Sequence, residues 1–96
     1  MIRIISPASR ELFKAVEYYE EEQSGLGNRF WAEVDQHIGW ITFHPLVPRL
    51  RSGVYRRVNL KVFPYYIAYS IREDEIIVWA IANSHRQPEY WKARIN

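Results

Sequence analysis

The chain has 96 residues, of which 48% are hydrophobic, with no cysteine and a net charge of +2. This length fits one domain over residues 1–96, and the lack of cysteine excludes disulfides and thiolate metal ligands. No apolar stretch approaches the ~18 residues of a membrane span, and the start does not look like a signal peptide, so we expect a soluble cytoplasmic protein without membrane contacts.

The N-terminal third predicts a short strand followed by a helix. Ile2–Ile5 is an apolar run with one arginine, which is typical of an edge strand. Ser6 is a good N-cap and Pro7 is tolerated in the first helical turn, so a helix should begin there. Apolar residues recur at helical spacing, and Gly25 suits a left-handed cap at the helix end. The residues of this predicted apolar stripe are Leu12, Ala15, Val16 and Tyr19.

A second helix is predicted from Gly27 or Asn28 to His44, where Pro45 stops it. Its apolar stripe comprises Phe30, Val34, Ile38 and Ile41, and we expect Phe30 and Val34 in the core. The short connection between the helices predicts an antiparallel hairpin. His37 shares a helix face with His44, but no third ligand lies near them, so we predict neither a metal site nor another cofactor.

The second half predicts three strands, over residues 55–63, 64–72 and 75–82. The turn between the last two is too short for a parallel crossover, so these strands should pair antiparallel. Residues 45–54 form an irregular connection that carries Arg49 and Arg51. The predicted fold is therefore α+β: an N-terminal strand and a helical hairpin packed on one face of a small, mainly antiparallel sheet that ends in a three-strand meander.

Charge is distributed unevenly along the chain. Residues 1–35 carry seven acids and four bases, whereas residues 36–96 carry four acids and nine bases. No acid lies between Asp35 and Glu73. The bases in that interval are Arg49, Arg51, Arg56, Arg57, Lys61 and Arg72. This asymmetry favours an anionic partner, and the alternative is a solvated face that confers only solubility.

Alternation in the first predicted strand indicates one covered face and one cationic face. Arg57, Asn59 and Lys61 alternate with Val58, Leu60 and Val62. The second half also holds more tyrosine and tryptophan than a sheet can bury without partners for the polar tips, so some should line the open face. These residues are Tyr55, Tyr65, Tyr66, Tyr69 and Trp79. Such rings could stack unpaired bases, or they could form ordinary cross-strand pairs.

Three features together resemble the RelE/ParE superfamily of toxins from bacterial type II toxin-antitoxin pairs, some of which are known as plasmid stabilisation proteins. They are the lead-in Phe63-Pro64-Tyr65, the alternating final strand, and the ending from Asn83 to Trp91 with its Pro-x-Tyr-Trp. The resemblance covers nearly the whole chain. It implies a small toxin that a cognate antitoxin neutralises, with a toxin–antitoxin heterotetramer as one assembly.

The resemblance implies one of two activities. One branch cleaves messenger RNA on the ribosome by attack of the 2′-hydroxyl on the adjacent phosphate, and the other inhibits DNA gyrase without cleaving nucleic acid. The positions that match the catalytic residues of the cleaving branch are Arg57, Lys61, His85, Arg86 and Tyr90. The positions expected to bind the substrate are Arg49, Arg51, Arg56 and Tyr65.

Each of the C-terminal candidates also has a structural interpretation. His85 could transfer protons or order the end of a strand, and Tyr90 could serve catalysis or, with Trp91, dock the tail on the sheet. Members of the cleaving branch often carry several lysines, or a glutamate that acts as base, around the sheet face. This sequence has only Lys61 there and no acid in the middle of a strand. We nevertheless favour ribosome-dependent RNA cleavage over gyrase inhibition, with a non-toxic antitoxin-binding protein as a third hypothesis. RNA cleavage requires Arg57, Lys61 and Arg86 to share one surface.

Overall fold

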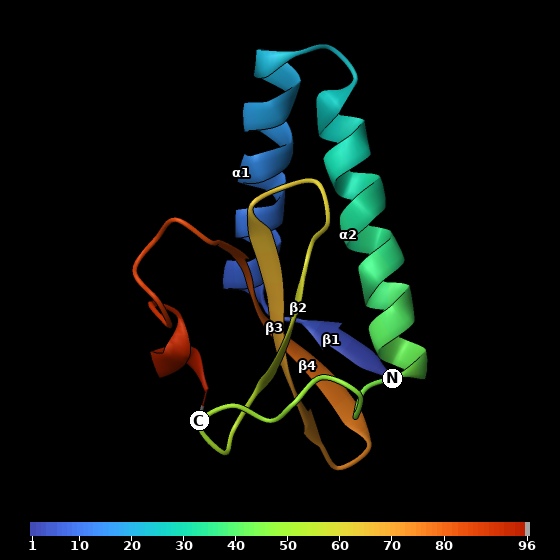
Figure 1. Cartoon of the computed structure of the whole chain (residues 1–96), viewed down its shortest axis with the longest axis vertical. Helices are drawn as coiled ribbons and strands as arrows, with labels where there is room; N and C mark the ends of the chain where they lie inside the picture. The colour runs from blue at the N-terminus through green and yellow to red at the C-terminus, as the bar shows by residue number, and fades with distance from the viewer. Residues whose placement is uncertain (96) are drawn as a thin grey trace.

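In the computed structural model, which describes residues 1–95, two helices lie side by side against a small sheet (Figure 1). The elements are β1 (Ile2–Ile4), α1 (Ser6–Glu22), α2 (Leu26–Phe43), β2 (Arg56–Asn59), β3 (Tyr65–Arg72), β4 (Glu75–Asn83) and the 3₁₀ helix η1 (Lys92–Arg94). The strand order is β1-β4-β3-β2, with β1 parallel to β4 and the other pairings antiparallel. The predicted α+β fold is confirmed. No helix within residues 1–95 is long and apolar enough to cross a bilayer.

The helix boundaries differ from the prediction by a few residues. Ser6 is the first residue of α1 and not its N-cap; Ile5 takes that place without a side-chain cap. Gly25 has the expected left-handed backbone, with φ at 90°, but it precedes α2 and does not close α1. The Glu20 carboxylate accepts hydrogen bonds from the backbone N–H groups of Gly25 and Gly27, at 3.0 Å each for the shorter contacts. A carboxylate on α1 therefore caps the N-terminus of α2, where negative charge is favoured.

The two helices approach each other closely at Gly27. A Cβ atom built on this glycine would lie 2.6 Å from the carbonyl oxygen of Val16. Because this oxygen belongs to the backbone of α1, a side chain at position 27 would force the helices apart. Gly27 is therefore required where the hairpin closes.

The larger core lies between the helices and the sheet. Phe30 and Val34 are buried as predicted, at 0% and 1% exposure, against strand residues such as Ile67 and Ile81. Rings from both helices and the strands meet there: the Phe30 centroid lies 5.0 Å from that of Phe63. This core holds the helical hairpin in a fixed position over β3 and β4.

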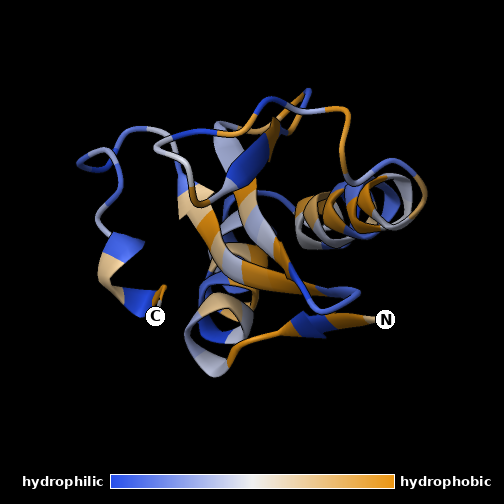
Figure 2. Cartoon of the chain, turned by 90° about the horizontal axis from the view of Figure 1, so that it is seen from below, coloured by the Kyte–Doolittle hydropathy of each residue, from blue (hydrophilic) through white to orange (hydrophobic). Residues whose placement is uncertain are grey.

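The opposite face of the sheet is covered by the tail, residues 84–95. Figure 2 shows the tail at left, separated by the strands from α2 at right. Trp91 is 1% exposed and packs with Tyr55, Tyr66 and Trp79 in a second core. The expectation that rings line an open face is therefore wrong for Tyr55, Tyr66 and Trp79, which the tail buries, and for Tyr69, which lies in the helix-side core.

The polar tips of these buried rings all have partners. Tyr69 donates to the carbonyl oxygen of Pro45 at 2.7 Å, and the Trp79 indole donates to the hydroxyl of Ser70 at 2.8 Å. Tyr55 donates to a carboxylate oxygen of Glu89 at 2.6 Å. The polar tips of these rings therefore have hydrogen-bond partners within the protein and do not need an open, solvent-facing surface.

A β-bulge in β4 changes which side chains of this strand face each of the two cores. Ala68 pairs with Ala80, but the next residue of β3, Tyr69, pairs with Val78, so Trp79 is an additional residue. Val78 consequently faces the helices, whereas Trp79 and Ala80 both face the tail. The bulge gives the tail a wider apolar surface than strict alternation would.

Candidate functional site

A hollow of about 260 Å³ opens between α1, the end of β4 and the tail. We call it the Arg86 hollow. The charged, aromatic and polar side chains that line it are Glu11, Lys14, Tyr18, Tyr65, Asn83, Arg86 and Tyr90. The structure therefore brings together three of the predicted site residues, Tyr65, Arg86 and Tyr90, from segments that are distant in the sequence.

Arg86 is exposed and lies over the ring of Tyr90. Its guanidinium carbon is 3.9 Å from the ring centroid, which is a cation–π contact. The backbone N–H of Arg86 donates to the carbonyl oxygen of Asn83 at 3.2 Å, so a tight turn after β4 positions the residue. The guanidinium charge is therefore supported by an aromatic ring at an exposed position.

The hydroxyl of Tyr90 donates a hydrogen bond to the Glu11 carboxylate. Burial, and then this bond to Glu11, raise the pKa of the Tyr90 phenol well above its ordinary value. The phenol therefore holds its proton more tightly than a free tyrosine does, and this proton is hydrogen-bonded to Glu11.

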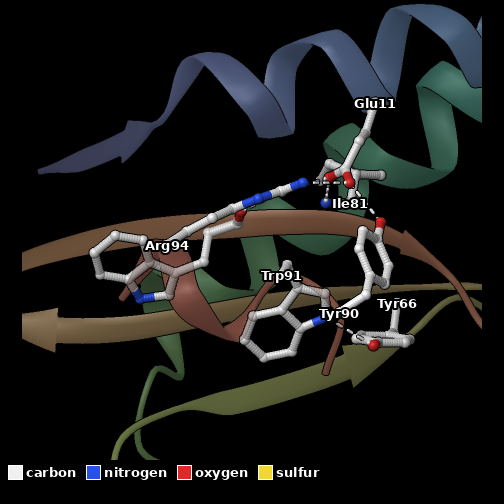
Figure 3. A network of polar contacts seen from close by, with 7 residues as sticks. Glu11, Tyr66, Ile81, Tyr90, Trp91 and Arg94 are labelled. Atoms are coloured by element: carbon white, nitrogen blue, oxygen red, sulfur yellow. Dashed lines mark hydrogen bonds and ion pairs between the residues drawn. The ribbon is translucent and has the colours of Figure 1, made fainter. Parts of the chain in front are cut away.

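Glu11 is the residue on which the tail converges (Figure 3). Its Oε1 accepts from the backbone N–H of Ile81 and from Nη1 of Arg94, both at 3.1 Å. Its Oε2 accepts from Nη2 of Arg94 at 3.0 Å and from the Tyr90 hydroxyl. Both oxygens of the carboxylate are thus used within the protein, and Arg94 neutralises its charge.

The sequence analysis did not identify Glu11, although the helical spacing contained a signal. Glu11 lies three residues after Ala8 and four before Ala15, both of which are buried. It therefore belongs to the inward stripe of α1, where a carboxylate needs partners. An acidic residue at the helical spacing of the buried residues is a signal in the sequence for a carboxylate with a structural or functional role.

His85 lies in the turn after β4 and is exposed. Its backbone N–H donates to the side-chain oxygen of Asn83 at 2.8 Å, which orders the turn. His85 is not among the residues that line the Arg86 hollow. A proton-transfer role for His85 stays a prediction.

Lys61 and Arg57 lie in different surroundings from Arg86. Lys61 follows the end of β2 and lines a hollow of about 290 Å³ with His37 and Trp40 of α2. Arg57 covers the ring of Tyr66 at 3.9 Å on the tail side of the sheet. Lys61 therefore lies apart from Arg57 and Arg86, and a surface shared by Arg57 and Arg86 stays a prediction.

The remaining predicted residues divide between the connection and the Arg86 hollow. The Arg56 guanidinium donates to the carbonyl oxygen of Pro48 at 2.7 Å. The backbone N–H of Arg51 donates to the carbonyl oxygen of Tyr55, also at 2.7 Å. Both contacts fold the connection between α2 and β2, where Arg49 is exposed. Tyr65 alone of this group lines the Arg86 hollow.

Comparisons with known proteins agree with this architecture. A family model described as the ParE toxin of the type II toxin-antitoxin system, parDE, matches residues 2–88. A chain of the chromosomal ParDE TA system from P. aeruginosa superposes with a TM-score of 0.64 and 12% sequence identity, over 85% of this chain and 92% of that chain. This likeness shows the fold. A search of curated proteins gave no match.

Proposed function

The chain belongs to the family of ParE toxins of type II toxin-antitoxin systems, and from this premise we propose that it acts by inhibiting DNA gyrase and not by cleaving RNA. Family membership also implies an antitoxin partner. The proposal revises the preference that the sequence suggested, and it rests on how the predicted catalytic residues are arranged.

The observation that carries the proposal is that Lys61 lies apart from Arg86 and that Glu11 engages the Tyr90 hydroxyl. Cleavage requires one group that takes the 2′-hydroxyl proton, one that protonates the leaving oxygen and cations beside the phosphate. The Tyr90 hydroxyl is hydrogen-bonded to Glu11, and its raised pKa opposes proton release. The two cations are also apart, because Lys61 lies against α2 whereas Arg86 lies beside α1. This arrangement favours binding over proton transfer.

The Arg86 hollow has the features of a protein-binding surface. Arg86 is exposed over a rigid ring, and Lys14 adds a second cation from α1. Tyr18 and Tyr65 supply aromatic surface with polar tips, and Tyr18 is 56% exposed. Arginine and tyrosine are the residues enriched in the energetically important parts of protein interfaces. We propose that an acidic segment of gyrase binds here.

Two assays on the same protein test the proposal. Purified protein is titrated into a gyrase supercoiling reaction, and induced cells are analysed by mapping transcript 5′ ends. The proposal predicts loss of supercoiling and uncut transcripts. New 5′ ends within codons, together with unaffected supercoiling, would overturn it in favour of RNA cleavage. Normal growth after induction, with neither effect, would favour the non-toxic alternative.

A further inference from the structure

Glu11 of α1 contacts β4 and the tail, both of which lie far from it in the sequence. It accepts hydrogen bonds from Ile81 of β4 and from Tyr90 and Arg94 of the tail. The side chain of Glu11 is 16% exposed and that of Arg94 is 24% exposed, so the pair is shielded from water on most sides. A partly buried, doubly hydrogen-bonded ion pair fixes the geometry of both partners more firmly than a surface pair does.

The contacts form a chain from Glu11 to the exposed cation. Glu11 binds the hydroxyl at one end of Tyr90, and the ring of Tyr90 lies under Arg86 at 3.9 Å. A ring held at its hydroxyl cannot swing away from the turn that carries Arg86. We propose that Glu11 is a positioning residue, which holds the Tyr90 ring so that Arg86 is presented to the target.

Trp91 attaches the tail to the sheet independently, so the positioning role of Glu11 can be tested without detaching the tail. Its side chain is 1% exposed and its indole donates to the Tyr66 hydroxyl at 2.8 Å. Trp91 thus anchors the tail to the sheet without help from Glu11. Removal of the Glu11 charge should leave the tail attached but release the Tyr90 ring.

Glu11 also affects which charges the hollow offers. Arg94 neutralises Glu11 within the protein, so Lys14 and Arg86 give the rim of the hollow its positive charge. Glu11 and Arg86 line the same hollow, so without Arg94 the carboxylate would place an unpaired negative charge in the hollow that Arg86 lines. The Glu11–Arg94 pair therefore keeps Arg86 available for an anionic group.

A double-mutant cycle tests the chain of contacts, and its activity arm rests on the proposed function. Glu11→Gln removes the charge, and Tyr90→Phe removes only the hydroxyl, which leaves an aromatic ring that Glu11 no longer holds under Arg86. Each single variant should weaken gyrase inhibition by about ten- to hundredfold, and the double variant should be no weaker than the worse single one. Glu17→Gln, at an exposed position of the same helix, is the matched control and should match the wild type.

Two results would overturn the proposal: full potency in a folded Glu11→Gln variant, or losses that add up in the double variant. If Glu11→Gln does not fold, Tyr90→Phe still tests the contact, because it leaves the Glu11–Arg94 pair intact. A wild-type potency in Tyr90→Phe would then count against the proposal.

Backbone hydrogen exchange provides a readout that does not depend on the target. In Glu11→Gln, the hydrogen-bonded backbone amides of Arg86 and Tyr90 should exchange faster, about tenfold or more, while those of β3 and β4 keep their protection. Unchanged exchange at these two amides would overturn the proposal. If the wild-type protein fails to inhibit gyrase, the proposed function fails, whereas faster exchange would still support the positioning role of Glu11.

Discussion

The indole Nε1 of Trp91 donates a hydrogen bond to the hydroxyl oxygen of Tyr66 at 2.8 Å, which joins the tail to β3 on the face away from the helices. The ring of Tyr55 packs edge-on against the same indole, with centroids 4.7 Å apart. The tail is thus part of a second core, and its removal should have the consequences of a core mutation.

Replacing Trp91 with alanine should lower the free energy of unfolding by about 3–5 kcal/mol, because a large side chain at 1% exposure leaves a cavity and an unpaired Tyr66 hydroxyl. Urea unfolding followed by circular dichroism measures the change. Trp40→Ala is the control, because Trp40 is 40% exposed and its loss should cost about 1 kcal/mol or less. Equal losses in the two variants would show that the tail does not form a core.

Arg86→Ala should weaken gyrase inhibition roughly thirtyfold or more, which corresponds to about 2 kcal/mol for a central interface arginine. Its stability should change by about 1 kcal/mol at most, because the cation–π contact with Tyr90 is at an exposed position. Arg10→Ala, an exposed change on α1, should alter neither quantity. If Arg86→Ala retained full potency, the Arg86 hollow would not be the target-binding site.

Two glycines of α2 should respond to alanine in opposite directions. Gly27→Ala should destabilise the protein by about 1–3 kcal/mol, since its Cβ would meet the Val16 carbonyl oxygen at 2.6 Å. Gly39→Ala should stabilise it by about 0.5–1 kcal/mol, because nothing lies within 4 Å and alanine favours the helix. Thermal or urea unfolding of the two variants separates these effects. Stabilisation by Gly27→Ala would contradict the close helix approach.

Stability should fall at alkaline pH. Burial raises the pKa of Tyr55 to about 12, with help from its bond to Glu89, and burial raises the pKa of Tyr69 to about 12. The folded state therefore holds these protons more tightly than the unfolded state, whose tyrosines titrate near 10. The contribution is fully present below pH ~10 and is lost as pH rises toward 12.

Urea midpoints measured at intervals from pH 8 to pH 11.5 test this dependence. The midpoint should be flat near pH 8–9 and should drop above pH 10. Tyr69→Phe should have a shallower drop, because the phenylalanine ring has no proton to lose. A midpoint that stays constant up to pH 11.5 would contradict the raised pKa values.

The helices and strands were predictable because each follows a local pattern. The three- and four-residue spacing from Phe30 to Ile41 and the short turn after Arg72 are signals within a few residues. Hydrophobic burial then selects the arrangement in which both stripes face the sheet. The element order and the mainly antiparallel sheet follow from these local features.

The candidate site was predicted only in part because its contacts join distant segments. Glu11 and Arg94 form an ion pair although most of the chain separates them in sequence, and no local sequence pattern predicts such a pair. The alternation that grouped Arg57 with Lys61 assumed a strand to Phe63, but β2 ends at Asn59. The bulge at Trp79 likewise breaks the two-residue period and gives the tail a place to pack.

The parallel pairing of β1 with β4 determines when the molecule can fold during its synthesis. Ile2 pairs with Ile76, so β1 has no partner until the chain has been synthesised through β4. At about 5–20 residues per second, translation needs roughly 4–15 s to reach that partner, and Trp91 comes later still. The four-stranded sheet therefore cannot be completed, and Arg86 cannot be held over Tyr90, until β4 and the tail have been synthesised.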